Sequence, residues 1–195
     1  MWDERYSGDD FVYGTEPNDF LRSQVENIPA GRVLCLAEGE GRNAVFLAEQ
    51  GFNVTAVDQS AVGLAKARRL ANQRGVEINT VVADLAEFVL ESNAWDGIVS
   101  IFAHMPAQAR AHIHREVVRG LRPGGVLVLE AYRPEQLQYK TGGPPAAEMM
   151  MDLDGLHTEL AGLDFEFAAE TVRDIQEGPL HHGPGAVVEI LARKR

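Results

Sequence analysis

Short apolar runs alternate along this chain with segments whose apolar residues recur at helical spacing. Val33–Ala37 is an unbroken run of small and apolar residues, typical of a strand buried on both faces. Further strands are predicted at residues 53–57, 78–83, 95–102, 126–132, 165–175 and 186–192, and helices at 43–50, 61–74, 85–90, 106–121 and 152–163. This alternation predicts an α/β fold with a seven-stranded, mainly parallel sheet and helices on both faces.

The two ends of the chain depart from the alternation. Only a loop separates the last two predicted strands, so they must pair antiparallel. Ahead of the first strand, Phe20, Leu21 and Val25 form a short amphipathic helix that ends before Pro29. We expect a single domain over residues 1–195, in which the N-terminal segment 1–31 precedes a core of residues 32–195.

Two of the predicted helices carry basic side chains that we expect to face solvent. Ser60 is a good N-cap residue for the first of them, and Gly75 follows its end. The second is rich in arginine and also carries two histidines. The residues expected on these solvated faces are Lys66, Arg68, Arg69, Arg74, His112 and His114.

A glycine turn follows the first strand. Gly39 and Gly41 stand where the chain must turn sharply, and Arg42 or Asn43 then opens a helix. Asp58 ends the next strand 19 residues after Gly39, near the spacing at which an acidic residue meets ribose hydroxyls in nucleotide-binding units. The alternative is a tight turn that binds no ligand.

Four motifs in this order resemble those of class I S-adenosylmethionine-dependent methyltransferases: Leu36–Gly41, Val57–Ser60, Val81–Leu85 and Leu121–Gly125. The glutamate-rich first motif is most similar to a small branch related to tellurite-resistance methyltransferases and, more distantly, thiopurine methyltransferases. The resemblance covers roughly residues 10 to 195 and implies a Rossmann-like core with S-adenosylmethionine as the cofactor.

The resemblance also implies roles for single residues. Asp58 would accept hydrogen bonds from the ribose, Asp84 from the adenine amine, and the backbone amide of Leu85 would reach a ring nitrogen. The family usually has an acidic residue at the position of Cys35, and this chain has Glu38 instead where a small residue is common, so the carboxylate that meets the methionine amino group stays open. The expected cofactor contacts are Glu38, Gly39, Gly41, Asn43, Asp58, Gln59, Asp84, Leu85, Phe102 and Tyr13.

Aromatic residues precede the first strand, and Tyr13 is one of them. They could simply pack against the edge of the sheet. They could also form a lid over the cofactor, which the family resemblance favours. We expect Tyr13 and the segment around it to belong to such a lid, since glycine and proline interrupt this segment.

Candidate acceptor contacts follow the later strands. His104 and Arg133 each come directly after a strand, and open parallel sheets bind ligands beyond the carboxyl ends of their strands. The loop of residues 133–145 is a candidate substrate cover. His181 and His182 with Glu177 could suggest a metal site, but adjacent residues of an extended chain point to opposite sides. We expect no metal, and one of these histidines at the substrate mouth.

Composition limits the partners. The net charge of −11 argues against a nucleic acid as substrate and against an anionic membrane surface. The single cysteine, Cys35, lies in a predicted buried strand, so neither a disulfide framework nor a cysteine metal cluster is expected. We expect a cytoplasmic protein that acts on a small molecule, because no signal peptide or membrane-spanning run is recognisable. The oligomeric state stays open.

Methyl transfer from a sulfonium requires alignment and exclusion of water more than activation. No Asn-Pro-Pro-Tyr-type motif for amine methylation follows the fourth strand, where Ala103–Pro106 stands instead. We therefore expect a small acceptor with a soft chalcogen nucleophile or an oxyanion. The alternatives are a non-catalytic regulator that binds S-adenosylmethionine and a nicotinamide-dependent oxidoreductase. The oxidoreductase would need a catalytic Tyr-x-x-x-Lys or similar pair, and we identify none.

Overall fold

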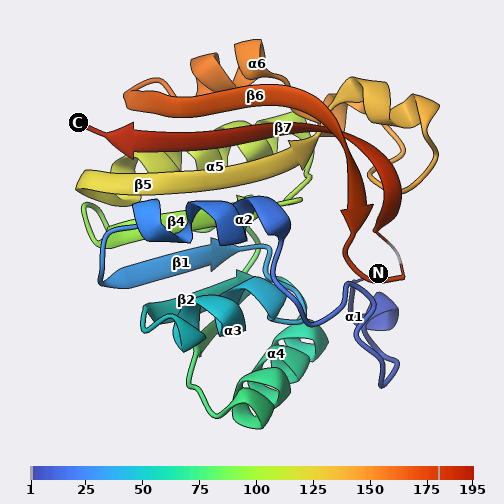
Figure 1. Ribbon diagram of the computed structural model, residues 1–195. Helices are drawn as coiled ribbons and strands as arrows, with labels where there is room; N and C mark the ends of the chain where they lie inside the picture. The colour runs from blue at the N-terminus through green and yellow to red at the C-terminus, as the bar shows by residue number, and fades with distance from the viewer. Residues whose placement is uncertain (1, 180) are drawn as a thin grey trace.

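The computed structural model describes residues 2–179 and 181–195, and its centre is one seven-stranded sheet (Figure 1). The strand order is β3-β2-β1-β4-β5-β7-β6, with the first five strands parallel and β7 antiparallel to both of its neighbours. The predicted fold class is confirmed. The strands are β1 (Arg32–Leu36), β2 (Asn53–Asp58), β3 (Asn79–Val82), β4 (Trp95–Ile101), β5 (Leu121–Tyr132), β6 (Leu163–Gln176) and β7 (His182–Lys194).

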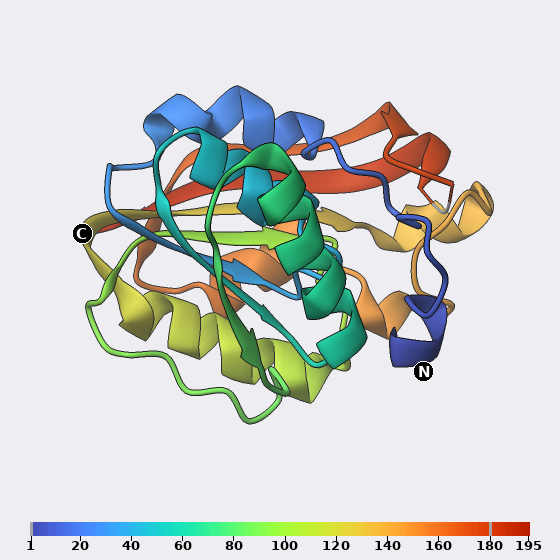
Figure 2. The same cartoon turned by 90° about the horizontal axis from the view of Figure 1, so that it is seen from below.

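Helices cover both faces of the sheet. Figure 2 shows α2, α3 and α4 on one face and α5 on the other, with the short α1 at the edge where the parallel strands end. The helices are α1 (Trp2–Arg5), α2 (Asp19–Gln24), α3 (Arg42–Glu49), α4 (Ala61–Arg74), α5 (Ala107–Gly120) and α6 (Leu153–Glu159). Three 3-10 turns complete the structure: η1 (Val25–Asn27), η2 (Pro134–Gln138) and η3 (Ala147–Met149).

Strand β1 explains how both faces are filled. Because side chains alternate along a strand, Val33 and Cys35 pack with the helices of one face, and Leu34 and Leu36 pack with those of the other. All four are buried. The apolar run that predicted a strand buried on both faces is therefore the centre of two hydrophobic cores.

The order of the strands reverses between β1 and β4, which lie side by side although β2 and β3 come between them in the chain. Open sheets bind ligands at such a switch point, beyond the carboxyl ends of the strands. The N-terminal segment and the far end of the β6–β7 hairpin both reach this edge in Figures 1 and 2. The fold thus directs two distant parts of the chain toward one site.

One predicted helix is wrong. Residues 85–90 hold only a turn, in which the Asp84 carboxylate accepts from the amide of Ala86 at 2.9 Å. The backbone of this segment bonds to side chains of α5 in place of its own turns: His112 lies 3.0 Å from the Phe88 carbonyl, and the Leu90 amide donates to Glu116 at 2.8 Å. Tertiary hydrogen bonds have replaced the local ones that a helix would need.

Two residues expected on solvated faces are buried. Lys66 forms an ion pair with Glu40 at 2.5 Å and donates to the carbonyl of Asp10 at 2.6 Å, because the N-terminal segment packs over α4. His114 lies 2.7 Å from the carboxylate of Glu159 on the helix α6. The N-terminal segment and α6 cover these side chains, and helical spacing alone does not reveal such neighbours.

Candidate active site

The glycine turn after β1 uses backbone conformations that favour glycine. Gly39 and Gly41 have φ of 60° and 93°. A side chain on Gly41 would place its first carbon 2.6 Å from the Cβ of Ala67, so its absence lets the turn lie against α4. At Gly39 the same carbon would lie 2.6 Å from the hydroxyl oxygen of Tyr6. The turn therefore lies tightly between α4 and the N-terminal segment.

Glu38 caps the helix that follows this turn. One of its carboxylate oxygens accepts from the amides of Asn43 at 2.9 Å and Ala44 at 2.8 Å. Burial raises the pKa of Glu38 to about 7, against the lowering effect of these two amides and of Arg42. Gly41 occupies the N-cap position and has no side chain to offer, so Glu38 supplies the missing acceptor.

Asp58 ends β2 beside the same turn. Its two carboxylate oxygens accept from the amides of Gly39 at 2.9 Å and Ser60 at 2.8 Å, and burial raises its pKa. A carboxylate has about four lone-pair directions, so each oxygen can accept a further bond from a vicinal diol. The strand end that the sequence singled out is thus fixed by the backbone of the turn.

The residues expected at the adenine follow the neighbouring strands. Asp58 and Val82 are register partners in β2 and β3, so Gln59 and Asp84 leave the sheet at one edge. Both side chains are exposed, whereas Leu85 is buried in the core. The structure therefore brings Gln59, Asp84 and Leu85 to the end of the sheet that also holds the glycine turn.

Five aromatic rings meet beyond β4 and β5. Phe102, in a left-handed conformation with φ of 52°, lies 4.6 Å from Tyr132 and 4.8 Å from His181, measured between ring centroids. His181 lies 4.6 Å from Tyr13, and His104 stacks on Tyr132 at 5.5 Å. We call Tyr13, Phe102, His104, Tyr132 and His181 the aromatic cluster. It joins the N-terminal segment, two strand ends and the hairpin tip.

His104 is held by the backbone of β5. Its Nε2 accepts from the amide of Tyr132 at 2.9 Å, which leaves the proton of the neutral ring on Nδ1. Burial lowers the pKa of His104 to about 4, so the ring is neutral at pH 7.

Arg133 points toward another part of the molecule. Its guanidinium pairs with Glu135 at 3.1 Å and with Glu170 at 3.3 Å, and Glu170 also accepts from the amide of Leu153, which begins α6. Among the described residues, no hydrogen bond or ion pair joins Arg133 to His104. The structure thus places these two candidates after adjacent strands without bringing their side chains together.

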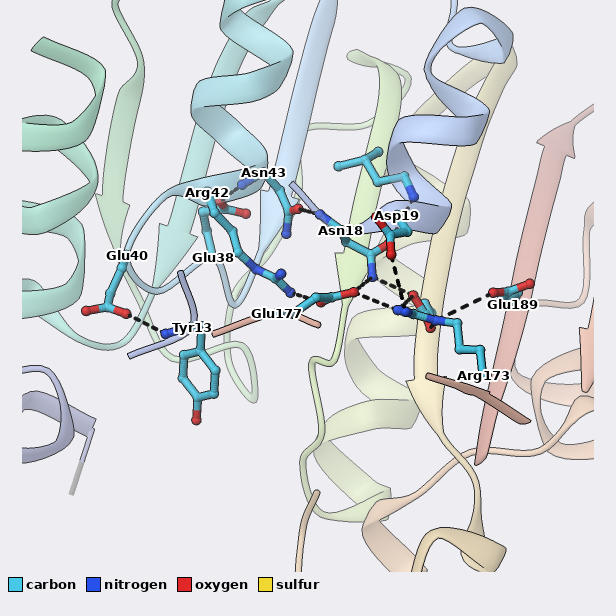
Figure 3. Close-up of polar contacts among 12 residues, drawn as sticks. Tyr13, Asn18, Asp19, Glu38, Glu40, Arg42, Asn43, Arg173, Glu177 and Glu189 are labelled. Atoms are coloured by element: carbon cyan, nitrogen blue, oxygen red, sulfur yellow. Dashed lines mark hydrogen bonds and ion pairs between the residues drawn. The ribbon is translucent and has the colours of Figure 1, made fainter. Parts of the chain in front are cut away.

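A polar network of largely buried side chains surrounds Glu177 (Figure 3). Glu177 accepts from Arg42 at 2.5 Å, from Asn18 at 2.9 Å and from Arg173 at 2.6 Å. Glu130 accepts from Asn18 at 2.5 Å and from Arg173 at 2.7 Å. We call these five residues the buried network, and it links the N-terminal segment, the glycine-turn helix, β5 and the hairpin.

The charges of the buried network balance one another. Burial raises the pKa of Glu130 more than Arg173 lowers it. Burial would also raise the pKa of Glu177, but Arg42 and Arg173 outweigh this effect and lower it. Sequence reasoning missed the network, although a glutamate inside the otherwise apolar run 126–132 was a signal that β5 holds a paired charge.

The described residues contain no group of three or more histidine, cysteine or acidic side chains arranged to hold a metal ion. His182 is exposed, while His181 packs in the aromatic cluster. Within the same described part of the chain, no helix has both the length and the apolar character that crossing a membrane requires.

Comparison with known proteins finds a methyltransferase domain in part of the chain. Residues 33–125 match the family model of a methyltransferase domain. The chain is 31% identical over 160 residues to the malonyl-(acyl-carrier protein) O-methyltransferase of Enterobacter lignolyticus, covering 79% of this chain and 62% of that protein. Across three curated relatives, the chain spans between 44% and 62% of the relative's length.

Solved structures share the fold. A protein structure concerned with conversion of a disulfide bond into a thioacetal group in echinomycin biosynthesis matches with a TM-score of 0.75 at 21% identity, covering 99% of this chain and 90% of that one. TehB from Haemophilus influenzae matches with a TM-score of 0.72 at 18% identity, covering 100% and 66%. Residues 33–125 are thus matched as a methyltransferase domain, and the chain has the fold of solved structures of S-adenosylmethionine-dependent methyltransferases.

Proposed function

We propose that this protein transfers a methyl group from S-adenosylmethionine to a small-molecule acceptor whose nucleophile is a soft chalcogen or an oxyanion. Relatives of similar identity are named for methylation at oxygen, nitrogen or carbon, so the acceptor must be argued from the site. The observation that carries the proposal is the arrangement at the carboxyl edge of the sheet. There Asp58 accepts from the amide of Gly39, and the Gly39 turn follows β1, which lies next to β4.

The cofactor contacts proposed here fit what the turn and the strand ends offer. Asp58 has lone pairs left for the ribose hydroxyls, and Gly39 presents a backbone without a side chain. Asp84 and the amide of Leu85 are proposed at the adenine. We also assign Glu38, Gly41, Asn43, Gln59, Phe102 and Tyr13 to the cofactor site.

Bound S-adenosylmethionine supplies an electrophilic methyl group, and the residues of this chain would orient the acceptor and exclude water. His104 is neutral at pH 7 because burial lowers its pKa to about 4, so its ring would position an acceptor through the Nδ1 proton. A soft nucleophile fits this arrangement, since it needs no strong base to remove a proton. Arg133 would contact an oxyanion only after its guanidinium left Glu135 and Glu170.

Turnover on an acceptor panel tests the proposal. Transfer of a labelled methyl group should be measured with tellurite, selenite and small thiols, beside an amine and an RNA. His104→Ala should lower turnover while leaving the affinity for S-adenosylhomocysteine nearly unchanged. Asp164→Ala serves as control, because Asp164 is exposed and pairs with Arg195. Methylation of the RNA or the amine, with none on the small soft acceptors, would contradict the proposed acceptor class.

A further inference from the structure

Two buried side-chain nitrogen atoms, one in the aromatic cluster and one in the buried network, have no hydrogen-bond partner among the described residues. They are Nη1 of Arg42 and Nδ1 of His181. Only 7% of the surface of Arg42 is exposed. Buried polar atoms in native proteins are nearly always hydrogen-bonded, so each exception needs an explanation. A bound ligand would explain both.

The two nitrogen atoms belong to one region. Arg42 and His181 are joined through Glu177, whose carboxylate accepts from Arg42 at 2.5 Å and whose amide donates to the carbonyl of His181 at 2.8 Å. Burial lowers the pKa of His181 to about 3, and the positive charge of Arg42 is the next cause. Both residues thus flank Glu177, where the glycine-turn helix meets the hairpin.

The N-terminal segment holds the hairpin against this region. Gly178 follows Glu177 with φ of 84°, and a side chain there would place its first carbon 2.5 Å from the nitrogen of Gly14. The ring of His181 lies 4.6 Å from that of Tyr13, measured between centroids. The hairpin tip, residues 177–179 and 181–182, is thus fixed between the N-terminal segment and the glycine-turn helix.

The chemistry of the two atoms selects the ligand. The planar guanidinium of arginine carries a positive charge and matches a group with two oxygens. One of its terminal nitrogens is used by Glu177, so the other remains for a ligand oxygen. A neutral His181 can carry its proton on Nδ1 and donate a hydrogen bond to the same ligand group. The surrounding rings of Phe102 and Tyr132 favour a small ligand with an apolar part.

We propose that Arg42 Nη1 and His181 Nδ1 form a subsite for a carboxylate or oxyanion group, between the glycine-turn helix and the hairpin tip. The inference rests on the proposed function, because methyl transfer provides two sources for this group: the acceptor, or the methionine end of the cofactor. Glu177 is a positioning residue in this subsite, since it acts by orienting the Arg42 guanidinium.

The test replaces both partners of the Arg42–Glu177 pair with glutamine, so that no buried charge is left alone. In the double variant Arg42→Gln/Glu177→Gln, Arg173 keeps Glu130 as its partner at 2.7 Å. His181→Phe keeps a ring in the aromatic cluster and removes both ring nitrogens, including Nδ1. Arg193→Gln/Glu166→Gln is the matched control, because it removes an Arg–Glu pair between β6 and β7 on a partly exposed surface.

Isothermal titration gives the readout. Selenite, 3-mercaptopropionate and neutral 3-mercaptopropanol are titrated into protein saturated with S-adenosylhomocysteine. Separately, S-adenosylhomocysteine is compared with 5′-methylthioadenosine, which lacks the amino-acid part. For an acceptor subsite, the double variant should bind both anions at least about tenfold more weakly, with smaller losses in His181→Phe. The neutral thiol, S-adenosylhomocysteine and the control should be unaffected.

The other outcomes are equally decisive. A tenfold loss for S-adenosylhomocysteine alone, with 5′-methylthioadenosine unchanged, assigns the subsite to the methionine carboxylate. Unchanged affinities for every probe in the double variant, or a wild type that binds neither anion while S-adenosylhomocysteine binding is unaffected, overturns the subsite. A wild type that binds the anions through Arg42 and methylates none of them removes the proposed acceptor class and leaves the subsite standing.

Discussion

The two halves of the sheet differ in the groups that donate hydrogen bonds to their buried or capping carboxylates. In the half formed by β1, β2 and β3, Glu38, Asp58 and Asp84 each accept from backbone amides of the turns that follow their strands. In the half formed by β5, β6 and β7, Glu130 and Glu177 accept from side chains on distant elements. Apart from Glu40, which pairs with Lys66, the carboxylates of the first half are held by local backbone geometry, whereas Glu130 and Glu177 are held by long-range ion pairs.

This difference carries an energetic consequence. A carboxylate held by backbone amides stabilises a turn, and its removal leaves only a few amide donors without an acceptor. A carboxylate in a buried ion pair compensates a charge, and removing it leaves that charge without its partner in a medium of low dielectric. We therefore expect the β5–β7 half to depend on its carboxylates for folding, and the β1–β3 half to depend on them for ligand binding.

Removal of Glu130 should have the largest effect. Glu130 is fully buried and bonds to Arg173 through both oxygens, at 2.7 and 3.0 Å. Glu130→Ala should lower the free energy of unfolding by about 3–5 kcal/mol, because Arg173 loses its bidentate partner. Urea denaturation followed by circular dichroism measures this change.

Glu166→Ala is the control for that prediction. Glu166 also pairs with an arginine of the sheet, Arg193 at 2.5 Å, but both side chains are about one third exposed. Its loss should cost no more than about 1 kcal/mol. Equal destabilisation by Glu130→Ala and Glu166→Ala would mean that burial does not distinguish the two halves.

The comparison also explains what the sequence could predict. Strand β1, the Ser60 N-cap and the αL glycine that ends α4 depend on residues within a few positions of one another, and the structure has all three. The buried network joins Asn18 to Glu130 and Glu177 across 112 and 159 positions. No local pattern encodes such partners, so they emerge only once the strand order is known.

The wrong predictions have the same origin. Lys66 has the helical position of a solvated residue, and its burial depends on the N-terminal segment, which carries Asp10 and lies 56 positions away. The turn after Asp84 lacks helical bonds because α5 supplies side-chain partners to Phe88 and Leu90. Local propensity was overridden in both places by contacts between distant parts of the chain.

The pH dependence of stability should distinguish Glu38 from a paired carboxylate. Burial raises its pKa from 4.5 to about 7, so the folded state binds the proton more tightly than the unfolded one. The stabilisation is therefore complete below about pH 4.5 and is lost as the pH rises through 7, up to about 3 kcal/mol at 1.36 kcal/mol per pKa unit.

Comparison with Glu38→Gln isolates this contribution. Urea denaturation between pH 5 and pH 8 should show the wild type losing stability relative to the variant as the pH increases. The amide oxygen of the variant can still accept from Asn43 and Ala44, so the helix cap is retained. Parallel pH profiles for the two proteins would show that Glu38 is ionised throughout this range in the folded state.

Asp58→Ala should weaken cofactor binding more than it affects folding. Loss of its carboxylate leaves two ribose hydroxyls without acceptors, which should cost about 1–3 kcal/mol of binding free energy for S-adenosylhomocysteine. Calorimetric titration measures the dissociation constant, with Asp164→Ala as control on an exposed carboxylate. An unchanged dissociation constant in Asp58→Ala would place the ribose elsewhere. It would also contradict the expectation that the β1–β3 half depends on its carboxylates for ligand binding.

The smallest expected effect concerns the place where the two halves meet. The amide of Tyr13 donates to Glu40 beside the glycine turn at 3.3 Å, and its ring packs on His181 of the hairpin. If this segment covers the cofactor, S-adenosylhomocysteine should slow amide hydrogen exchange in residues 8–18 severalfold, because their opening would require the ligand to lose contacts. Exchange in α6, Leu153–Glu159, is the internal reference, since that helix lies on the other face of the sheet. Equal protection of residues 8–18 with and without the ligand would identify the segment as ordinary packing. The contact between the two halves would then be the same in both states.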